Sequence, residues 1–312
     1  MVAESRIIAA DTAGIAAAAE ILRAGGLVAV PTETVYGLAA RADDGQAVAA
    51  IYAAKGRPSF NPLIVHVADV AQAETLALFS PLALRLATRF WPGPLTLVLP
   101  RHEAAAVAGL VTAGLATVAL RCPAHPVMQA LIAAVGPLAA PSANASGRIS
   151  PTRAAHVLAS LTDVAVIDAG PCAAGVESTI VAVEGDGWRL LRAGAVAVEA
   201  IVDVAGPALA APPVADVRAP GMLASHYAPA QPVRLNANSA QPDEFHIGFG
   251  PVAGDATLSA TGDLTEAAAR LFDLLHVAEA SGRAAIAVAP VPAHGLGLAI
   301  NDRLQRAAAP RP

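Results

Sequence analysis

The stretch GGLVAVPTETVYGL, from Gly25 to Leu38, joins a short apolar run to a polar turn. Its paired glycines favour the end of a preceding helix, and Leu27 to Val30 is typical of a short buried strand. The segment PTETVYGL follows directly and brings three hydroxyls and a carboxylate into a turn that Gly37 closes. Because open α/β sheets bind ligands beyond the carboxyl ends of their strands, this turn is a candidate binding segment. An ordinary capped turn is the alternative interpretation.

The same alternation of apolar runs and helical patterns continues over the first two-thirds of the chain, which predicts an α/β fold. The predicted strands are 27–30, 63–67, 95–99, 116–120, 138–140, 164–167, 179–183 and 189–191. The predicted helices are 12–24, 45–54, 81–90, 126–135 and 152–161. Ser150 and Pro151 suggest a capping hydroxyl and a first-turn proline for the last of these helices.

The character of the sequence changes after Gly206. Residues 207–232 contain many prolines and little periodicity, which is typical of a linker. Beyond them, strands are predicted at 233–235, 245–249 and 285–289, and an amphipathic helix at 264–280. We therefore predict a first domain over 1–206, a linker over 207–232 that can serve as a lid, and a small second α/β domain over 233–312.

Composition excludes several classes of protein. Apolar residues make up 55% of the 312 residues and charged residues 14%, unlike a disordered chain. No apolar run is long enough for a membrane span, and no secretory signal precedes the first domain, so we expect a cytoplasmic protein. The net charge of −5 argues against tight nucleic-acid binding, which requires a basic face. The two cysteines, Cys122 and Cys172, fit neither a zinc site nor a disulfide framework.

Basic residues gather in the segment KGRPSFNPLIVH, from Lys55 to His66. Lys55 is the single lysine beside 19 arginines, so it is a candidate for a position that needs a compact ammonium. Arg57 offers a planar fork suited to phosphate, in a loop that two prolines stiffen. Asn61 and His66 follow in the same segment, although a lone histidine on a strand is more often structural.

Three further segments carry candidate residues. PSANASGRISPT (141–152) forms a small polar loop before a helix and could present amides and hydroxyls to an anion. ESTIV (177–181) and LRAG (191–194) predict a hairpin across 184–187 that places Arg192 at a strand end. PGMLASHYAP (220–229) sets a His-Tyr pair between prolines, and such a segment could close over a ligand. Capped loops, surface arginines and an anchored linker are the alternatives.

Taken in order, these segments resemble those of the YrdC-type threonylcarbamoyl-adenylate synthases, in their long form with an additional C-terminal domain. The resemblance covers nearly the whole chain and is strongest from Gly25 to Gly194. It implies a twisted mixed α/β sheet with a large open cavity, followed by a small Rossmann-like α/β domain. It also implies an enzyme that converts L-threonine, bicarbonate and ATP into threonylcarbamoyl-AMP and pyrophosphate, for use by the tRNA-modification machinery.

Site residues carry over from the resemblance position by position. It implies that Lys55 and Arg57 act in catalysis. The threonine site would comprise Thr34, His66, Arg121, Ser142 and Ser178. The ATP site would comprise Arg57, Asn61, Thr117, Asn144, Thr152, Arg192 and Tyr227. No protein metal site is implied, and Mg²⁺ would arrive on the nucleotide because no carboxylate pair forms a cage.

Other functions stay open at this point. A non-catalytic RNA-binding protein of the same fold would use the basic cavity for RNA, although the acidic net charge and the absence of aromatic stacking platforms argue against it. A carbamoyl-transfer enzyme of hydrogenase maturation would need zinc-finger or acylphosphatase-like segments, which the sequence lacks. All the enzyme hypotheses require that Arg57, Ser142 and Arg192 converge on one cavity.

Overall fold

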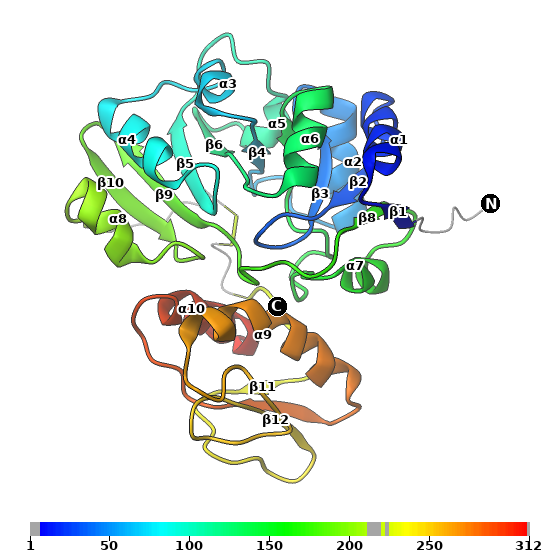
Figure 1. The fold of residues 1–312 in the computed structure, drawn as a ribbon, viewed down its shortest axis with the longest axis vertical. Helices are drawn as coiled ribbons and strands as arrows, with labels where there is room; N and C mark the ends of the chain where they lie inside the picture. The colour runs from blue at the N-terminus through cyan, green and yellow to red at the C-terminus, as the bar shows by residue number, and fades with distance from the viewer. Residues whose placement is uncertain (1–6, 211–219, 222–224, 311–312) are drawn as a thin grey trace.

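The computed structural model describes residues 7–210, 220–221 and 225–310. Two sheets organise the chain (Figure 1): a ten-stranded sheet with strand order β1-β8-β2-β3-β7-β4-β6-β5-β9-β10, and a four-stranded sheet with order β11-β14-β12-β13. The α/β fold class and the twisted mixed sheet are thereby confirmed. Among the described residues, no helix is long and apolar enough to cross a membrane.

The large sheet is built from short strands that the chain visits out of order. They are β1 (Ile7–Ala9), β2 (Val28–Val30), β3 (Gly37–Arg41), β4 (Ile64–His66), β5 (Leu95–Pro100), β6 (Thr117–Arg121), β7 (Leu138–Ala139), β8 (Ala165–Asp168), β9 (Thr179–Glu184) and β10 (Gly187–Arg192). The helices between them are α1 (Thr12–Arg23), α2 (Gly45–Lys55), α3 (Val70–Glu74), α4 (Pro81–Phe90), α5 (Gly109–Thr112), α6 (Pro126–Val135), α7 (Ala154–Ser160) and α8 (Val198–Ala205).

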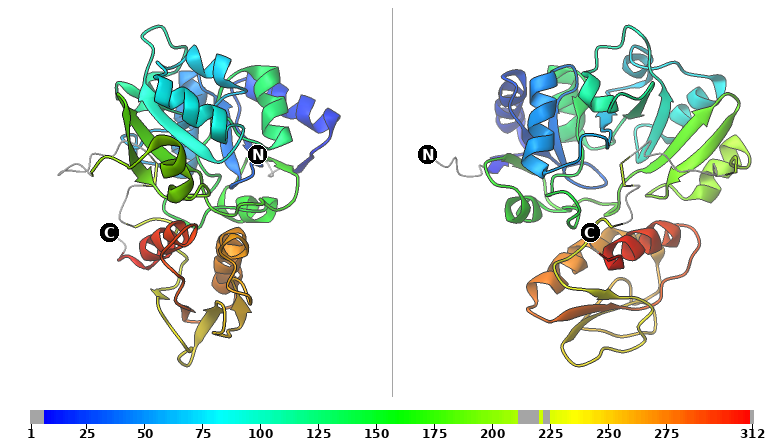
Figure 2. Two further views of the ribbon diagram at one scale, coloured as in Figure 1. Left: turned by 60° about the vertical axis from the view of Figure 1, so that its left-hand side comes forward. Right: turned by 180° about the vertical axis from the view of Figure 1, so that it is seen from behind.

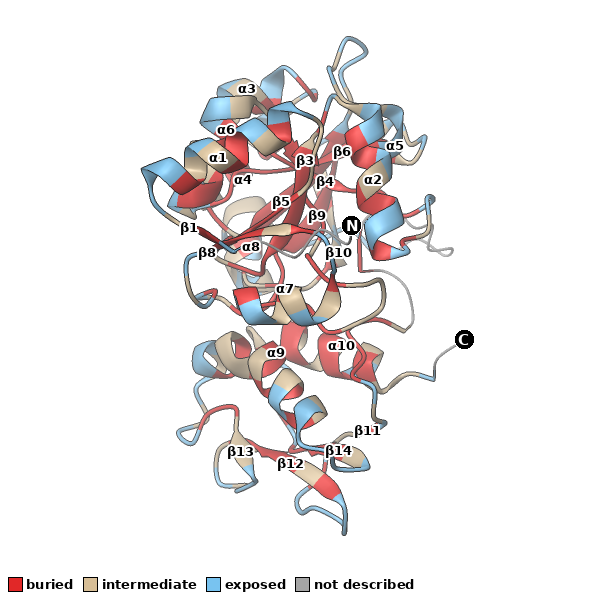
Figure 3. Cartoon of the chain, turned by 90° about the vertical axis from the view of Figure 1, so that its right-hand side faces the viewer, coloured by how far each residue is buried: buried red, intermediate tan, exposed pale blue. Residues whose placement is uncertain are grey.

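Alternating residues of the strands bury both faces of this sheet. Val28 and Val30 of β2 pack with α1 and α6, whereas Ala29 between them packs with α2 on the opposite face. The central strands are largely buried (Figure 3), whereas the edge strands β1 and β10 carry exposed residues. Burial on both faces explains why the strands read as continuous apolar runs in the sequence.

The smaller sheet carries its helices on the side that faces the larger part of the molecule (Figure 2). Its strands are β11 (Val233–Arg234), β12 (Glu244–Gly248), β13 (Ala256–Thr257) and β14 (Ala285–Val288), all paired in parallel, with helices α9 (Leu264–Ala280) and α10 (Gly297–Ala308). Leu271, Phe272 and Leu275 of α9 form its core with Ile286 and Ile300. Parallel strands with covering helices agree with the predicted small α/β domain.

The predicted strands and helices are all observed, whereas β1, β3, β13, α3, α5, α8 and α10 were not predicted. One predicted helix begins later than expected. Helix 152–161 was expected to open at Ser150-Pro151, but α7 begins at Ala154 and its N-cap Arg153 makes no side-chain capping bond. The Ser150 hydroxyl donates to Glu177 instead, at 2.5 Å. The Ser150 hydroxyl is of the kind that caps helices, but in the folded chain it contacts a distant segment instead.

Candidate functional site

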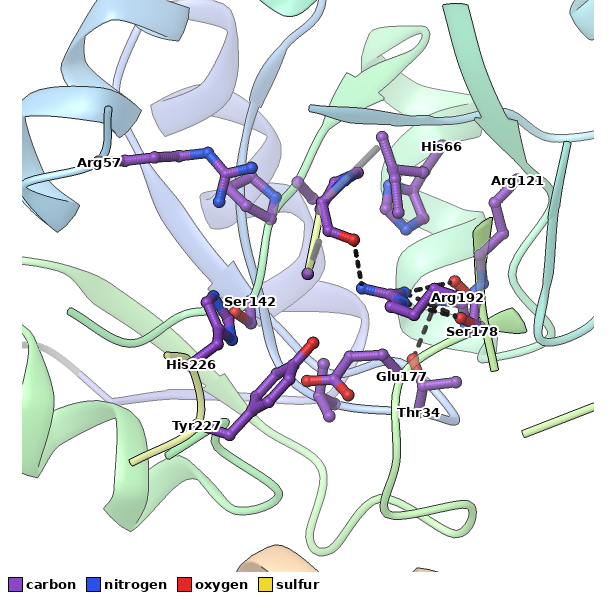
Figure 4. Close-up of a pocket in the computed structure, with 16 residues that line it drawn as sticks. Thr34, Arg57, His66, Arg121, Ser142, Glu177, Ser178, Arg192, His226 and Tyr227 are labelled. Atoms are coloured by element: carbon purple, nitrogen blue, oxygen red, sulfur yellow. Dashed lines mark hydrogen bonds between the residues drawn. The ribbon is translucent and has the colours of Figure 1, made fainter. Parts of the chain in front are cut away.

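The ends of six strands meet at one pocket. β4 and β6 run parallel, with His66 beside Arg121 in the register, so both strands deliver their last residue to the same edge. Ser178 immediately precedes β9 and Arg192 ends β10. The polar turn after β2 and the loop after β7 complete the wall through Thr34 and Ser142. Figure 4 shows these side chains directed toward a common space.

Two buried arginines in the pocket are held by oxygen atoms without formal charge. Arg57 donates through Nε to the Asn61 carbonyl at 3.2 Å and through Nη2 to the Pro62 carbonyl at 2.9 Å. Arg192 donates through Nη2 to the Ser178 carbonyl at 2.9 Å and to the Ser178 hydroxyl at 3.2 Å. Burial lowers the pKa of Arg57 to about 10, which leaves it charged at pH 7. The two guanidiniums are thus oriented while their charge remains available to an anion.

Arg121 is bound differently from these two arginines. Its Nη1 donates to the Thr34 hydroxyl at 2.9 Å, and its Nη2 lies 2.7 Å from a Glu33 carboxylate oxygen. The ion pair fixes the arginine against the polar turn after β2. This contact explains why a glutamate stands inside the PTETVYGL segment.

Two buried histidines face the pocket in their neutral form. Burial, with Arg121 acting in the same direction, lowers the pKa of His66 to about 3. Burial likewise lowers the pKa of His226 to about 3. Among the described residues, the Nδ1 atom of each ring has no hydrogen-bond partner. Both imidazoles are therefore available to a ligand as hydrogen-bonding groups without charge.

The segment between the two sheets closes one side of the pocket. Pro220, Gly221, His226 and Tyr227 line it. Gly221 adopts a left-handed backbone with φ of 83°, and a Cβ there would lie 2.6 Å from the Tyr227 hydroxyl, so only glycine fits. Residues 211–219 and 222–224 of the predicted linker lie outside the described residues.

Most of the residues predicted for the site line this one pocket. They include all five residues predicted to surround threonine and three of those predicted for ATP: Thr34, Arg57, His66, Arg121, Ser142, Ser178, Arg192 and Tyr227. The required convergence of Arg57, Ser142 and Arg192 is therefore observed. Which ligand each residue contacts stays a prediction.

Five predicted residues do not line the pocket, and Lys55 is the most informative of them. Its ammonium donates to the Ser142 carbonyl at 2.5 Å and also to the Asn144 carbonyl, and the side chain is buried. Burial holds the pKa of Lys55 well below its usual range. In this structure the lysine therefore fixes the loop 141–146, and a catalytic role for it stays a prediction.

Asn61 and Asn144 are buried close to the pocket wall. Each keeps a side-chain Oδ1 that has no partner among the described residues. The Asn61 carbonyl accepts from Arg57, and Asn144 lies in the loop that carries Ser142. Such unpaired buried oxygens are uncommon in a folded protein and are expected to find a partner in a ligand or water.

Thr117 and Thr152 do not line the pocket. Continuing the β4–β6 register places Thr117 next to Pro62, at the Arg57 end of the site. The Thr152 hydroxyl lies 3.4 Å from His156 Nδ1, near the smaller domain. Their roles in ATP binding stay predictions.

Glu177 was not among the site residues predicted from the sequence, although it lies in the segment ESTIV. Glu177 lines the pocket, is buried, and accepts from the Ser150 hydroxyl. The partner that makes a buried carboxylate tolerable is Arg303, 126 residues away in a helix that was not predicted. The apolar lining residues Val35, Ile64 and Ala140 were also missed, because nothing distinguishes them from core residues in sequence.

Within the described part of the chain, no three histidine, cysteine, aspartate or glutamate side chains gather into a metal-binding group. Both cysteines are free and buried. The arginines, hydroxyls and neutral imidazoles of the pocket are suited to anionic substrates.

Comparisons with known protein families divide the chain as its two sheets do. Residues 20–194 match the family of Sua5, YciO and YrdC proteins, which is described as telomere recombination. Residues 196–309 match the family described as threonylcarbamoyl-AMP synthase, C-terminal domain.

Individual relatives are similar over almost their whole length. The threonylcarbamoyl-AMP synthase of Bacillus subtilis is 42% identical over 95% of this chain and 93% of its own. That of Pyrococcus abyssi is 42% identical over 93% of this chain and 92% of its own. The crystal structure of P. abyssi Sua5 complexed with L-threonine superimposes with a TM-score of 0.88 at 39% identity, covering 97% of this chain and 98% of that one.

Proposed function

Because this chain belongs to the family of Sua5-type threonylcarbamoyl-AMP synthases, we propose that its pocket joins L-threonine, bicarbonate and ATP into threonylcarbamoyl-AMP and pyrophosphate. The protein is thus a nucleotidyltransferase whose product serves tRNA modification. The resemblance found in the sequence motifs is confirmed by both family matches. The relatives share this name over nearly the full chain, which supports the same activity here.

One observation carries the assignment: cationic and hydroxyl side chains from distant segments meet in one pocket. Buried guanidiniums that bond carbonyls keep their positive charge for a substrate, and threonylcarbamoyl-AMP synthesis involves a carboxylate and a polyphosphate. We assign Thr34, His66, Arg121, Ser142 and Ser178 to threonine. We assign Arg57, Asn61, Thr117, Asn144, Thr152, Arg192 and Tyr227 to ATP.

The reaction proceeds in two steps. The neutral amine of threonine attacks the carbon of bicarbonate, and water leaves to give an N-carboxylate. An oxygen of that carboxylate then attacks the α-phosphorus of ATP, and the bond to the β-phosphate oxygen breaks to release pyrophosphate. Both steps bring anions together, so orientation and charge neutralisation are the main demands on the protein.

The histidines of the pocket are suited to orientation rather than to proton transfer. An effective general base has a pKa near the working pH, and burial lowers the pKa of His66 to about 3. A neutral imidazole can still accept a hydrogen bond from the threonine ammonium or hydroxyl. Well-oriented reactants can account for about 7–11 kcal/mol of a barrier without any dedicated base.

We propose that Mg²⁺ enters on the nucleotide as part of the substrate. Polyphosphates commonly carry this ion with one or two protein carboxylates at most. Arg57 and Arg192 would then share the phosphate charge with the ion. Lys55 would support catalysis by holding the loop that carries Ser142, because its ammonium already contacts two carbonyls there.

The division into 1–206, 207–232 and 233–312 gives the middle segment a role as a lid. Its residues Pro220, Gly221, His226 and Tyr227 contribute one wall of the pocket. A segment that joins two domains and lines the site can exclude water once the substrates are bound. Threonine, ATP and tRNA all occur in the cytoplasm, where we place the reaction.

The RNA-binding alternative is less well supported. The three pocket arginines are at most 9% exposed, whereas nucleic-acid binding depends on an accessible basic face. Their burial beside serine and threonine hydroxyls favours small anionic substrates.

The test is a reconstitution with the purified full chain. ATP, Mg²⁺, bicarbonate and one amino acid at a time are incubated, and pyrophosphate and the product mass are measured. We expect pyrophosphate release to require both threonine and bicarbonate. Salt-sensitive RNA binding without pyrophosphate release would instead support the RNA-binding alternative.

A further inference from the structure

Arg303 is a fully buried charge that the smaller domain contributes beside the pocket. It lies in α10, has 0% exposure, and donates through Nε to a Glu177 carboxylate oxygen at 2.7 Å. Its Nη1 donates to Asp302 at 2.6 Å. A buried charge is tolerated only when it is paired and hydrogen-bonded, so this contact fixes how the two domains meet.

Glu177 is the partner that lies in the pocket wall. Burial on its own would raise the pKa of the Glu177 carboxyl, but Arg303 and Arg192 outweigh burial and hold that pKa below its usual range. The Ser150 hydroxyl donates to its other oxygen. The carboxylate is therefore charged, inside a pocket whose proposed substrates are anions.

Arg192 is the other cation that acts on Glu177. It adjoins the same pocket and is oriented by the Ser178 carbonyl and hydroxyl rather than by a carboxylate. In Figure 4 the Glu177 carboxylate and the Arg192 guanidinium both face the space between the strand ends. Without Arg303, Glu177 would be an unpaired buried carboxylate, which is unfavourable unless a second cation pairs with it.

We propose that Arg303 is a positioning residue of the active site: by pairing with Glu177, it keeps the Arg192 guanidinium free to bind the nucleotide. This inference rests on the proposed function for the identity of the ligand. It gives the smaller domain a role in substrate binding that does not require its own contact with substrate.

A second contact joins the same arginine to the lid segment. The Arg303 guanidinium lies 5.0 Å from the centre of the Tyr227 ring, within the range of a cation–π interaction. Phe272 of α9 packs on that ring at 5.6 Å. The arginine that neutralises Glu177 therefore also supports the aromatic wall of the pocket.

The experiment is a double-mutant cycle read by ATP binding. Isothermal titration calorimetry measures the Kd of Mg²⁺-ATP and, separately, of L-threonine for the full chain. We expect Arg303→Met to weaken ATP binding at least tenfold. The threonine Kd should change less than threefold, because Arg121, the arginine assigned to threonine, is paired with Glu33 and not with Glu177. In the Glu177→Gln background, the same change should alter ATP binding less than threefold.

Matched controls separate this effect from general damage. Arg270→Met removes an arginine from the same domain at an exposed pair with Glu266, and we expect its ATP Kd to equal that of wild type. Arg303→Lys keeps the charge and should stay within threefold of wild type, so it carries the test if Arg303→Met does not fold.

The inference is overturned if Arg303→Met binds ATP as wild type does, or if Glu177→Gln does not relieve its defect. The inference is also overturned if Arg303→Lys weakens ATP binding tenfold and adding Glu177→Gln does not restore it. Absence of ATP binding by the wild-type chain would instead overturn the proposed function, and this inference with it.

Discussion

Arginines of the pocket and arginines at the seam between the two domains have different partners. Arg57 and Arg192 donate to carbonyl and hydroxyl oxygens. At the seam, Arg148 lies 2.5 Å from Glu279 and Arg153 lies 2.6 Å from Asp273. A carbonyl orients a guanidinium without cancelling its charge, whereas a carboxylate neutralises it. For these four arginines the partner differs with the position in the molecule, whereas Arg121 of the pocket pairs with the Glu33 carboxylate.

Burial sharpens this difference. The side chains of Arg148 and Arg153 are 39% and 48% exposed, so solvent screens their ion pairs. The pocket arginines lie where the dielectric is low and an arriving anion interacts more strongly. Arg303 also pairs with a carboxylate across the seam, but unlike Arg148 and Arg153 it is fully buried.

The largest expected effect lies at the seam and depends on pH. His156 and His276 stack with ring centres 3.8 Å apart, among Asp273, Arg153, Glu279 and Arg148. Burial, with His276 acting in the same direction, lowers the pKa of His156 to about 4, against about 6.5 in an unfolded chain. The unfolded chain binds the proton first, so stability falls as pH drops from about 6.5 to about 4, by about 3 kcal/mol from this group.

Urea unfolding at pH 7 and pH 4.5 checks this prediction. His156→Gln should lose less stability over that interval than wild type. His294→Gln, at an exposed position, should lose as much as wild type. Equal losses in all three proteins would mean that the stacked histidines do not control the pH response.

The next largest effect is expected at Lys55. Its ammonium holds a loop, unlike the arginines that face the pocket. Lys55→Met would leave the Ser142 and Asn144 carbonyls without their charged donor. Bonds to charged groups contribute about 1.5–3 kcal/mol each, and relief of the buried charge offsets part of this, so we expect a net loss of about 2 kcal/mol in unfolding free energy. Chemical denaturation and the pyrophosphate assay should both report the loss; unchanged stability would refute the role in holding the loop.

Arg57→Ala should affect activity more than stability. The variant removes a charge available to the phosphates, and we expect kcat/KM for ATP to fall at least tenfold, about 1.4 kcal/mol of transition-state stabilisation. The unfolding free energy should fall by less than for Lys55→Met. Wild-type turnover by the variant would remove the basic loop from the mechanism.

Arg153→Ala should have the smallest effect. Exposed ion pairs contribute about 0.2–1 kcal/mol, so the unfolding free energy should fall by no more than about 1 kcal/mol. The ATP Kd should not change. A substantial loss of ATP binding would show that the seam arginines and pocket arginines are not separable in function.

Much of this arrangement was predictable from local sequence. Short apolar runs gave the strands β2, β4, β5, β6 and β9 within about two residues of their observed bounds, because residues buried on both faces must be apolar. The hairpin over 184–187 followed from a turn between two such runs, and β9 pairs with β10 antiparallel as predicted. Strand β3 was missed because Gly37 was taken to close a turn, whereas it begins a strand that pairs with β2.

The sequence by itself determined which strand-end segments carry arginines, hydroxyls and histidines, since these local patterns do not depend on the rest of the chain. Only the tertiary structure decided their partners. It directed Lys55 to a loop rather than to the pocket, Ser150 to Glu177 rather than to a helix N-terminus, and Arg303 across the seam to Glu177. The physical reason is that the charge state and availability of a buried group depend on what surrounds it in space, which residues far apart in the chain provide.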